Sequence, residues 1–234
     1  QRAHWRKHKK ECKKRAAELH DEALFNESQP RDECPICCLP LPISPAEQKY
    51  QPCCGKTVCC GCIYATYKAD RRQLCPFCRA SEPTSAGELI KRMNKRVATD
   101  DANAMRGLGT HYFNGEHGLP QDRNKAMELW LRAGELGCAE AYGNIADSYR
   151  NGVGVERDMK KAKHYLELQV IGGDVMARYN LGHLEGLAGN YCRAVKHHMI
   201  AAGAGDEDSL KNVQQYYLAG LATKNDFEKA LRSH

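Results

Sequence analysis

Long hydrophobic runs are missing from this 234-residue sequence. No stretch of about 18 or more apolar residues occurs, so no membrane-spanning helix is expected. The second half of the chain also shows no clustered pair of catalytic side chains and no phosphate-cradling glycine loop, so an enzymatic role for that half is not expected. Its isolated histidines are expected to be surface or packing residues, among them His111, His183, His197 and His198.

Excess positive charge is missing outside one short segment. Residues 1–15 hold eight Lys or Arg and one Glu, a local charge of +7, so the +6 of the whole chain leaves about −1 for the other 219 residues. A patch of this kind is most often a solvated helix face. Binding to nucleic acid is therefore not expected, although contact with nucleic acid or another acidic partner through residues 1–15 stays an alternative.

Cysteine is scarce in the last two thirds of the chain. Eleven of the 13 cysteines lie between Cys12 and Cys78, and only Cys138 and Cys192 follow them. The two regions must be stabilised in different ways, which predicts a boundary near residue 80. Clustered cysteines serve either as disulfides in secreted domains or as zinc ligands in reducing compartments.

Cysteine spacing favours zinc over disulfides. In a C-x-x-C knuckle, a tight turn points two sulfurs at one tetrahedral ion. Three such knuckles occur, at Cys34–Cys37, Cys59–Cys62 and Cys75–Cys78. With the adjacent Cys53 and Cys54 they make four pairs, and eight thiolates close two zinc sites. Because residues 34–79 have few large apolar side chains, metal binding must supply their folding free energy, and zinc ligation favours the cytosol or the nucleus.

The order of the four pairs resembles a RING domain, in which pairs one and three share one ion and pairs two and four share the other. The resemblance implies Cys34, Cys37, Cys59 and Cys62 as ligands of one zinc ion and Cys53, Cys54, Cys75 and Cys78 as ligands of the second.

Two features depart from that pattern. Lys56 stands where a common RING has a histidine, so the all-cysteine variant matches best, and Cys53 adjoins Cys54 instead of lying two residues before it. Cys38 and Cys60 are left as spare thiols, with a register that uses Cys60 in place of Cys59 as an alternative.

In RING ubiquitin ligases, three positions beside the ligands grip a ubiquitin-conjugating enzyme and its ubiquitin. The resemblance places Ile36, Pro76 and Arg79 at these positions. Thr66 stands where ligases often show a bulky residue, which Tyr67 or Ile63 can replace. The expected function is that of a ligase, and a non-catalytic zinc-binding adaptor is the alternative.

The opening segment QRAHWRKHKKEC resembles the end of a MYND zinc finger. His4, His8 and Cys12 follow one another at i, i+4 steps and would share one face of a helix. By the resemblance, His8 and Cys12 are ligands of an incomplete zinc site, and Trp5 is a packing residue. A basic helix with incidental His and Cys is the alternative.

A repeat of 36 residues runs through the second half. Asp122, Ala126, Gly137 and Ala141 recur as Asp158, Ala162, Gly173 and Ala177. Ala194 and Gly205 continue the pattern after a four-residue shortening, and Asp226 and Ala230 begin a fourth unit. Each unit is predicted to form two helices joined by a Gly-rich turn, and the Asp of that turn can cap the second helix.

These units resemble Sel1-like repeats, which are relatives of tetratricopeptide hairpins. The residues that carry the resemblance are Leu108, Gly109, Tyr112, Gly115, Gly118, Lys125, Ala126, Trp130, Ala133 and Gly137. The third unit departs most, because it lacks the Tyr and the long turn. The resemblance implies a short solenoid whose concave side binds a protein substrate or adaptor.

Together these features predict a mainly α-helical protein, in which a small zinc-stabilised RING domain precedes an α-solenoid of Sel1-like hairpins. The expected parts are a MYND-like remnant at 1–15, a helical linker at 16–33, the RING-like domain at 34–79, a hinge and helix at 80–101, and the repeats at 102–234.

Overall fold

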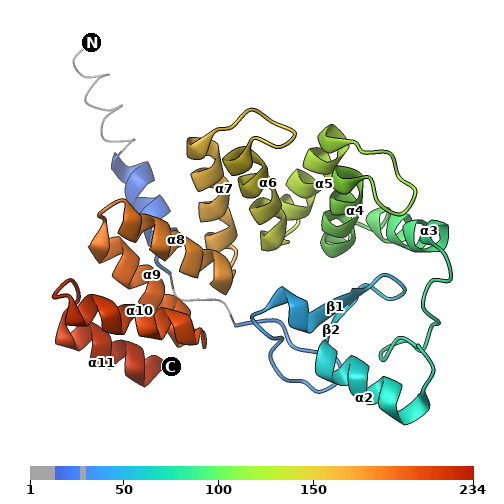
Figure 1. Ribbon diagram of the computed structural model, residues 1–234, viewed down its shortest axis with the longest axis horizontal. Helices are drawn as coiled ribbons and strands as arrows, with labels where there is room; N and C mark the ends of the chain where they lie inside the picture. The colour runs from blue at the N-terminus through green and yellow to red at the C-terminus, as the bar shows by residue number, and fades with distance from the viewer. Residues whose placement is uncertain (1–13, 27–29) are drawn as a thin grey trace. The chain divides into compact units, whose positions relative to one another are not determined.

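The computed structural model describes residues 14–26 and 30–234. The chain divides into two compact units, one formed by Gln29–Met176 and one that joins Gln1–Ser28 to Ala177–His234. Helices dominate both units (Figure 1). Among the described residues, no helix has the length and apolar character needed to cross a membrane. The domain limits expected from the sequence stay predictions.

The Gln29–Met176 unit begins with a small hairpin. A 3-10 turn, η1 (Pro45–Glu47), leads into β1 (Gln48–Gln51), which pairs antiparallel with β2 (Lys56–Cys59), and α2 (Cys60–Asp70) follows at once. Few apolar side chains are buried in residues 34–79: Cys34, Leu41 and Val58 pack in one cluster, and Cys75 is buried apart from them. Burial of so few side chains cannot offset the entropy of ordering about 45 residues, as the composition predicts.

Helix α3 (Ala86–Val97) joins the hairpin to the repeats. Ser85 caps it by accepting a hydrogen bond from the backbone N–H of Glu88. Met93 is buried together with Ala104 and Leu108 of the next helix, with Leu89 packed alongside. The helix therefore docks on the first repeat, as its apolar spacing predicts.

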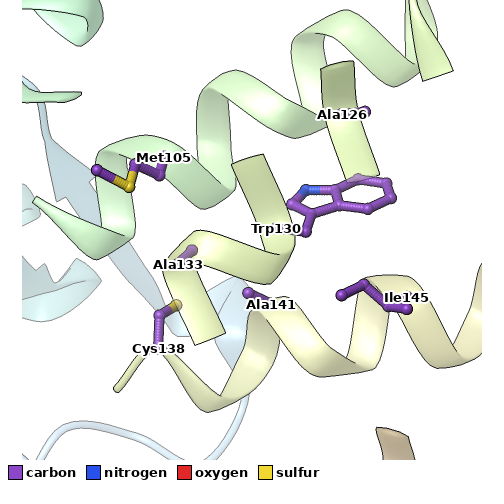
Figure 2. Packing of buried hydrophobic residues seen from close by; sticks show 7 residues of the cluster. All are labelled: Met105, Ala126, Trp130, Ala133, Cys138, Ala141 and Ile145. Carbon is purple, nitrogen blue, oxygen red and sulfur yellow. The ribbon is translucent and has the colours of Figure 1, made fainter. Parts of the chain in front are cut away.

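Four more helices complete this unit. They are α4 (Ala102–Asn114), α5 (Arg123–Glu135), α6 (Ala139–Asn151) and α7 (Met159–Ile171). Their core is centred on Trp130 (Figure 2). Its side chain is 3% exposed and donates from the indole Nε1 to the carbonyl of Arg106 at 3.1 Å. Gly109 allows this contact, because a Cβ there would lie 2.7 Å from the indole ring.

The other unit contains the remaining helices and the N-terminal segment. Its helices are most of α8 (Val175–Leu187), together with α9 (Tyr191–Gly203), α10 (Glu207–Leu218) and α11 (Lys224–Ser233), and residues 14–24 are also helical. Leu24 is fully buried, and its carbonyl accepts from Arg178 at 2.7 Å. Arg193 pairs with Asp21 at 3.0 Å. Residues 14–26 therefore belong to the fold of the last helices.

The buried pair His197 and His198 packs inside this second unit. Phe25 lies against the ring of His197 with 4.6 Å between ring centroids, and Ser209 lies 3.3 Å from Nδ1 of His198. Burial lowers the pKa of His197 to about 3 and that of His198 to about 4, so both are neutral near pH 7. Both fit the packing role predicted from the sequence.

The caps of the second helices follow the repeat. Asp122 and Asp158 each accept a hydrogen bond from backbone N–H groups of the helix that follows, as the sequence predicts. In the third repeat, the Asn190 side chain does not cap α9 and donates instead to Glu185 at 2.7 Å. In the last repeat, Thr223 caps α11, and Asp226 completes a capping box three residues later.

Candidate metal centre

The structure brings the eight cysteines into two groups of four. Cys34, Cys37, Cys59 and Cys62 form one cluster, and Cys53, Cys54, Cys75 and Cys78 form the other. Within each cluster all four Sγ atoms lie within 4.8 Å of one another. All twelve described cysteines are free thiols. The four pairs therefore alternate between two centres, as their order along the chain predicts.

The sulfur spacing fits zinc. A tetrahedral ion with Zn–S bonds of about 2.3 Å separates its ligand sulfurs by about 3.8 Å. The Sγ–Sγ distances are 4.0 Å for Cys37 and Cys59, 3.8 Å for Cys54 and Cys75, and 3.4 Å for Cys53 and Cys78. Both clusters can thus hold a metal ion with an all-sulfur ligand set and no open coordination position.

The hairpin explains how ten residues serve both centres. Cys53 and Cys54 lie in the turn between the strands, where the backbone N–H groups of Cys54 and Gly55 donate to the carbonyl of Gln51 at 3.2 and 2.8 Å. Cys59 ends β2, and Cys62 lies in the first turn of α2. The turn therefore supplies one cluster, and the strand end and helix start supply the other.

The two remaining knuckles share one backbone conformation. In the first, the N–H of Cys34 donates to Leu39 and the N–H of Cys38 donates back to Cys34, at 2.8 and 2.9 Å. In the second, the N–H of Cys75 donates to the carbonyl of Ala80 at 2.8 Å, and the N–H of Arg79 donates back to the carbonyl of Cys75 at 2.9 Å. Cys38 and Arg79 thus occupy equivalent left-handed positions, with φ of 56° and 62°. Cys38 has a turn position instead of a place in either cluster.

The spare thiols lie outside both clusters. Cys60 is exposed, and its Sγ lies 3.6 Å from the carbonyl oxygen of Ala46. Cys59, not Cys60, groups with Cys34, Cys37 and Cys62. His8 and Cys12, expected as ligands of a MYND-like site, lie outside the described residues.

Thiol ionisation inside each cluster is uneven. Burial raises the pKa of the Cys34 thiol, but backbone N–H groups of Cys37 and Cys59 outweigh it and lower that pKa to about 6. Burial and the neighbouring Cys59 thiol raise the pKa of Cys62. In the second cluster, burial and neighbouring thiols raise the pKa of Cys54 to about 11. Crowded thiolates repel one another, and a divalent cation removes that repulsion.

The hairpin turn is fastened to the first repeat by polar contacts. Tyr50 Oη donates to Asp101 Oδ2 at 2.7 Å, and Asp101 also caps α4 by accepting from the N–H of Ala104 at 3.1 Å. Arg96 of α3 donates to the carbonyl of Cys53 at 2.9 Å. Burial and the Asp101 carboxylate raise the pKa of Tyr50, so it stays a hydrogen-bond donor. The second cluster is therefore held against the start of the helical array.

Replacing Tyr50 by Phe tests this attachment. Asp101 loses a donor, so Tyr50→Phe is expected to lower the free energy of unfolding by about 1–3 kcal/mol. Hydrogen exchange of the hairpin and α4 amides measures the change. Tyr64→Phe in α2, where the ring is 64% exposed, is the control and is expected to change little. Equal effects of the two substitutions would contradict the attachment.

Comparison with protein families bears on the helical part. The family model described as Sel1 repeat matches residues 102–138, 139–168 and 215–232. The chain contains Sel1 repeats. The first two matches cover α4–α5 and most of α6–α7, and the third covers the end of α10 and most of α11. The third repeat, which departs most in sequence, is not among the matched segments.

Solved structures show the same fold. A Sel1 repeat protein from Oxalobacter formigenes is similar with 29% identity and a TM-score of 0.53, over 62% of this chain and 61% of that one. The c5321 protective antigen of uropathogenic Escherichia coli, which displays an SLR fold, is 20% identical with a TM-score of 0.53, over 73% of this chain and 36% of that one. The chain therefore spans less than two thirds of these relatives. No curated protein matches the sequence.

Proposed function

We propose that this protein is a RING-type ubiquitin ligase, in which two zinc ions fold residues 34–79 and the Sel1 repeats recruit a protein partner. The observation that carries the proposal is the alternation of the four cysteine pairs between two clusters, with one hairpin supplying both. This cross-linked pattern of two all-cysteine centres is the one that a RING domain needs. The incomplete MYND-like site at His8 and Cys12 is a further part of the proposal.

The residues expected to contact a conjugating enzyme are accessible. Ile36 is 40% exposed at the tip of the first knuckle, and Pro76 is half-buried at the tip of the second. The Arg79 side chain is 54% exposed directly after the last ligand. An apolar pair beside a forked cation suits a shallow protein interface that reaches both the enzyme and its ubiquitin.

Arg79 is oriented by an acidic residue of α2. Its Nη2 donates to Asp70 Oδ2 at 2.7 Å, and Arg72 donates to both oxygens of the same carboxylate, at 2.7 and 2.9 Å. The Arg72 guanidinium, with Arg79, holds the pKa of Asp70 below its usual value. Arg79 therefore has a defined direction while most of its donors stay available for a partner.

The proposed mechanism needs no nucleophile from this chain. Zinc, when bound, supplies the folding free energy of the domain, and its all-sulfur shell leaves no position for substrate. The Ile36, Pro76 and Arg79 surface then holds the conjugating enzyme and its thioester-linked ubiquitin in a restricted arrangement. The gain in rate comes from position, because a substrate lysine attacks an oriented thioester more often.

The Sel1 repeats supply the second contact of the proposed ligase. Stacked helical hairpins form an extended surface, and their matched residues have structural roles in capping and packing. We therefore assign recruitment of a substrate or adaptor protein to this part of the chain. Nucleic acid and membranes are not among the proposed partners.

A scaffold without ligase activity is the second candidate, and Thr66 favours it. Its Oγ1 bonds to the carbonyl of Cys62 in its own helix at 2.9 Å, so it offers no bulky contact. Ile63 packs on the core of Cys34, Leu41 and Val58. Tyr67 is 42% exposed and is the replacement that remains available on α2. If the protein is a scaffold, its zinc domain only mediates the assembly of protein complexes.

Ubiquitin-chain formation with a panel of conjugating enzymes separates the two functions. Chains are expected with at least one enzyme, and Ile36→Ala and Arg79→Ala are each expected to slow their formation at least about tenfold. Discharge of ubiquitin from the conjugating enzyme to free lysine gives the same comparison without a protein substrate.

Two matched variants control for folding and charge. Arg72→Ala removes the other arginine on Asp70, and Leu39→Ala removes an apolar side chain of the same knuckle that is 63% exposed. Both are expected to keep the parental rate within about twofold. Absence of chains with every enzyme in the panel would replace the ligase by the scaffold.

A further inference from the structure

A third group of metal-binding side chains lies at the end of α4, away from the cysteines. It consists of His111 in the last turn of the helix and of Glu116 and His117 in the turn that follows. Their donor atoms lie within 4.8 Å of one another. Nδ1 of His111 is 3.1 Å from Glu116 Oε2, and the two imidazole rings meet edge to face with centroids 4.5 Å apart.

The backbone holds these side chains together. The N–H groups of Gly115 and Glu116 both donate to the carbonyl of His111, at 2.9 and 3.0 Å. Asp122 closes the same loop by donating its N–H to Tyr112 at 2.9 Å. The three donors therefore come from a defined turn and not from a mobile loop end.

The second repeat shows that the turn itself does not need these residues. There the N–H of Val153 donates to Ser148 at 3.1 Å and that of Asp158 donates to Tyr149 at 3.0 Å, the same two closing bonds. Ser148 and Val153 thus replace His111 and Glu116. The second repeat also has one residue fewer, so that nothing corresponds to His117. His117 is the added residue, and it adopts a left-handed φ of 55°.

We propose that His111, Glu116 and His117 form an exchangeable site for a divalent transition metal, and that the metal bound there is Zn²⁺. Two imidazoles and one carboxylate are a donor set that zinc accepts. Three protein donors leave a coordination position open to water or to a side chain of a bound partner. This separates the site from the two closed cysteine clusters. The proposal is independent of ligase activity.

Calorimetric titration of zinc into the full chain tests the site. The cysteine clusters are first loaded with zinc and excess metal is removed by dialysis. A background with His4→Ala, His8→Ala and Cys12→Ala removes His8 and Cys12, the MYND-like ligands expected from the sequence, together with the nearby His4. Further Zn²⁺ is then expected to bind to about one more site per chain, and ring signals of His111 and His117 are expected to shift in NMR spectra.

Variants of the turn assign the binding. His117→Asn keeps a residue that tolerates the left-handed conformation, and Glu116→Gln keeps the size of the side chain. Each is expected to weaken the additional binding at least about tenfold. His164→Asn, at an exposed histidine of α7, is the control and is expected to leave the affinity within about twofold.

Two results would overturn the site. One is the absence of any zinc binding beyond the cysteine clusters, and the other is unchanged affinity in both His117→Asn and Glu116→Gln. Because the cysteine clusters are loaded first, their failure is seen as missing zinc before the titration begins. Such a failure does not prevent the titration from measuring zinc binding at His111, Glu116 and His117.

Discussion

Removal of zinc with a strong chelator is expected to unfold residues 34–79 and to leave the helices of the Sel1 repeats in place. The segment buries only Cys34, Leu41, Val58 and Cys75 among its apolar side chains, whereas a structural zinc site supplies about 10 kcal/mol or more. Loss of both ions removes most of what holds the hairpin. Amide signals of β1, β2 and α2 are expected to collapse to random-coil positions, while those of α4 to α7 persist.

Serine variants make the same test one thiol at a time. Cys75 is 3% exposed within the second cluster, and Cys75→Ser is expected to unfold the segment and to lower its zinc content. Cys60 lies one residue from a ligand position but outside both clusters, so Cys60→Ser is the matched control. It is expected to keep the parental zinc content and hairpin signals. A folded hairpin after confirmed loss of zinc would contradict the proposed role of the metal.

Truncation of Trp130 to Ala is expected to cost about 3–5 kcal/mol in the free energy of unfolding of the first repeats. The side chain is 3% exposed, fills the space above Gly109 and carries a hydrogen bond to Arg106. Its loss leaves a cavity and removes one of the hydrogen bonds that the Arg106 carbonyl accepts. Hydrogen exchange of the α4 and α5 amides measures the effect within the Gln29–Met176 unit.

Leu136→Ala provides the control for this truncation. Leu136 follows α5 directly and is 46% exposed, so its loss is expected to cost less than about 0.5 kcal/mol. A cost below about 1 kcal/mol for Trp130→Ala would show that the repeat core is not built around the indole ring.

The repeats were predictable because their signals are local and recur. Asp122 and Asp158 mark the starts of helices, and Gly137 and Gly173 adopt φ of 95° and 91°, which favours glycine. The sulfur pairs were predictable for a similar reason, since two cysteines in a tight turn have few other arrangements. The third repeat was harder, because Asn190 replaces the capping Asp.

Contacts between distant segments could not be predicted in the same way. The burial of Leu24, whose carbonyl accepts a hydrogen bond from Arg178, has no periodic signature, since the polar helix at 14–24 has only Leu19 and Leu24 as large apolar residues and Leu19 is 50% exposed. The hydrogen bond between Tyr50 and Asp101 likewise depends on the fold, and no local sequence pattern predicts it. His111 was expected to be isolated. The one sequence signal for His117, the extra residue of its turn relative to the second repeat, was not used in that expectation.

Zinc K-edge X-ray absorption of the purified chain, loaded with zinc and dialysed, tests the central claim most directly. The account predicts about two tightly bound ions per chain with four sulfur neighbours each at about 2.3 Å. Fewer than two bound ions, or a first shell dominated by nitrogen and oxygen, would contradict the two cysteine centres on which the proposed domain depends.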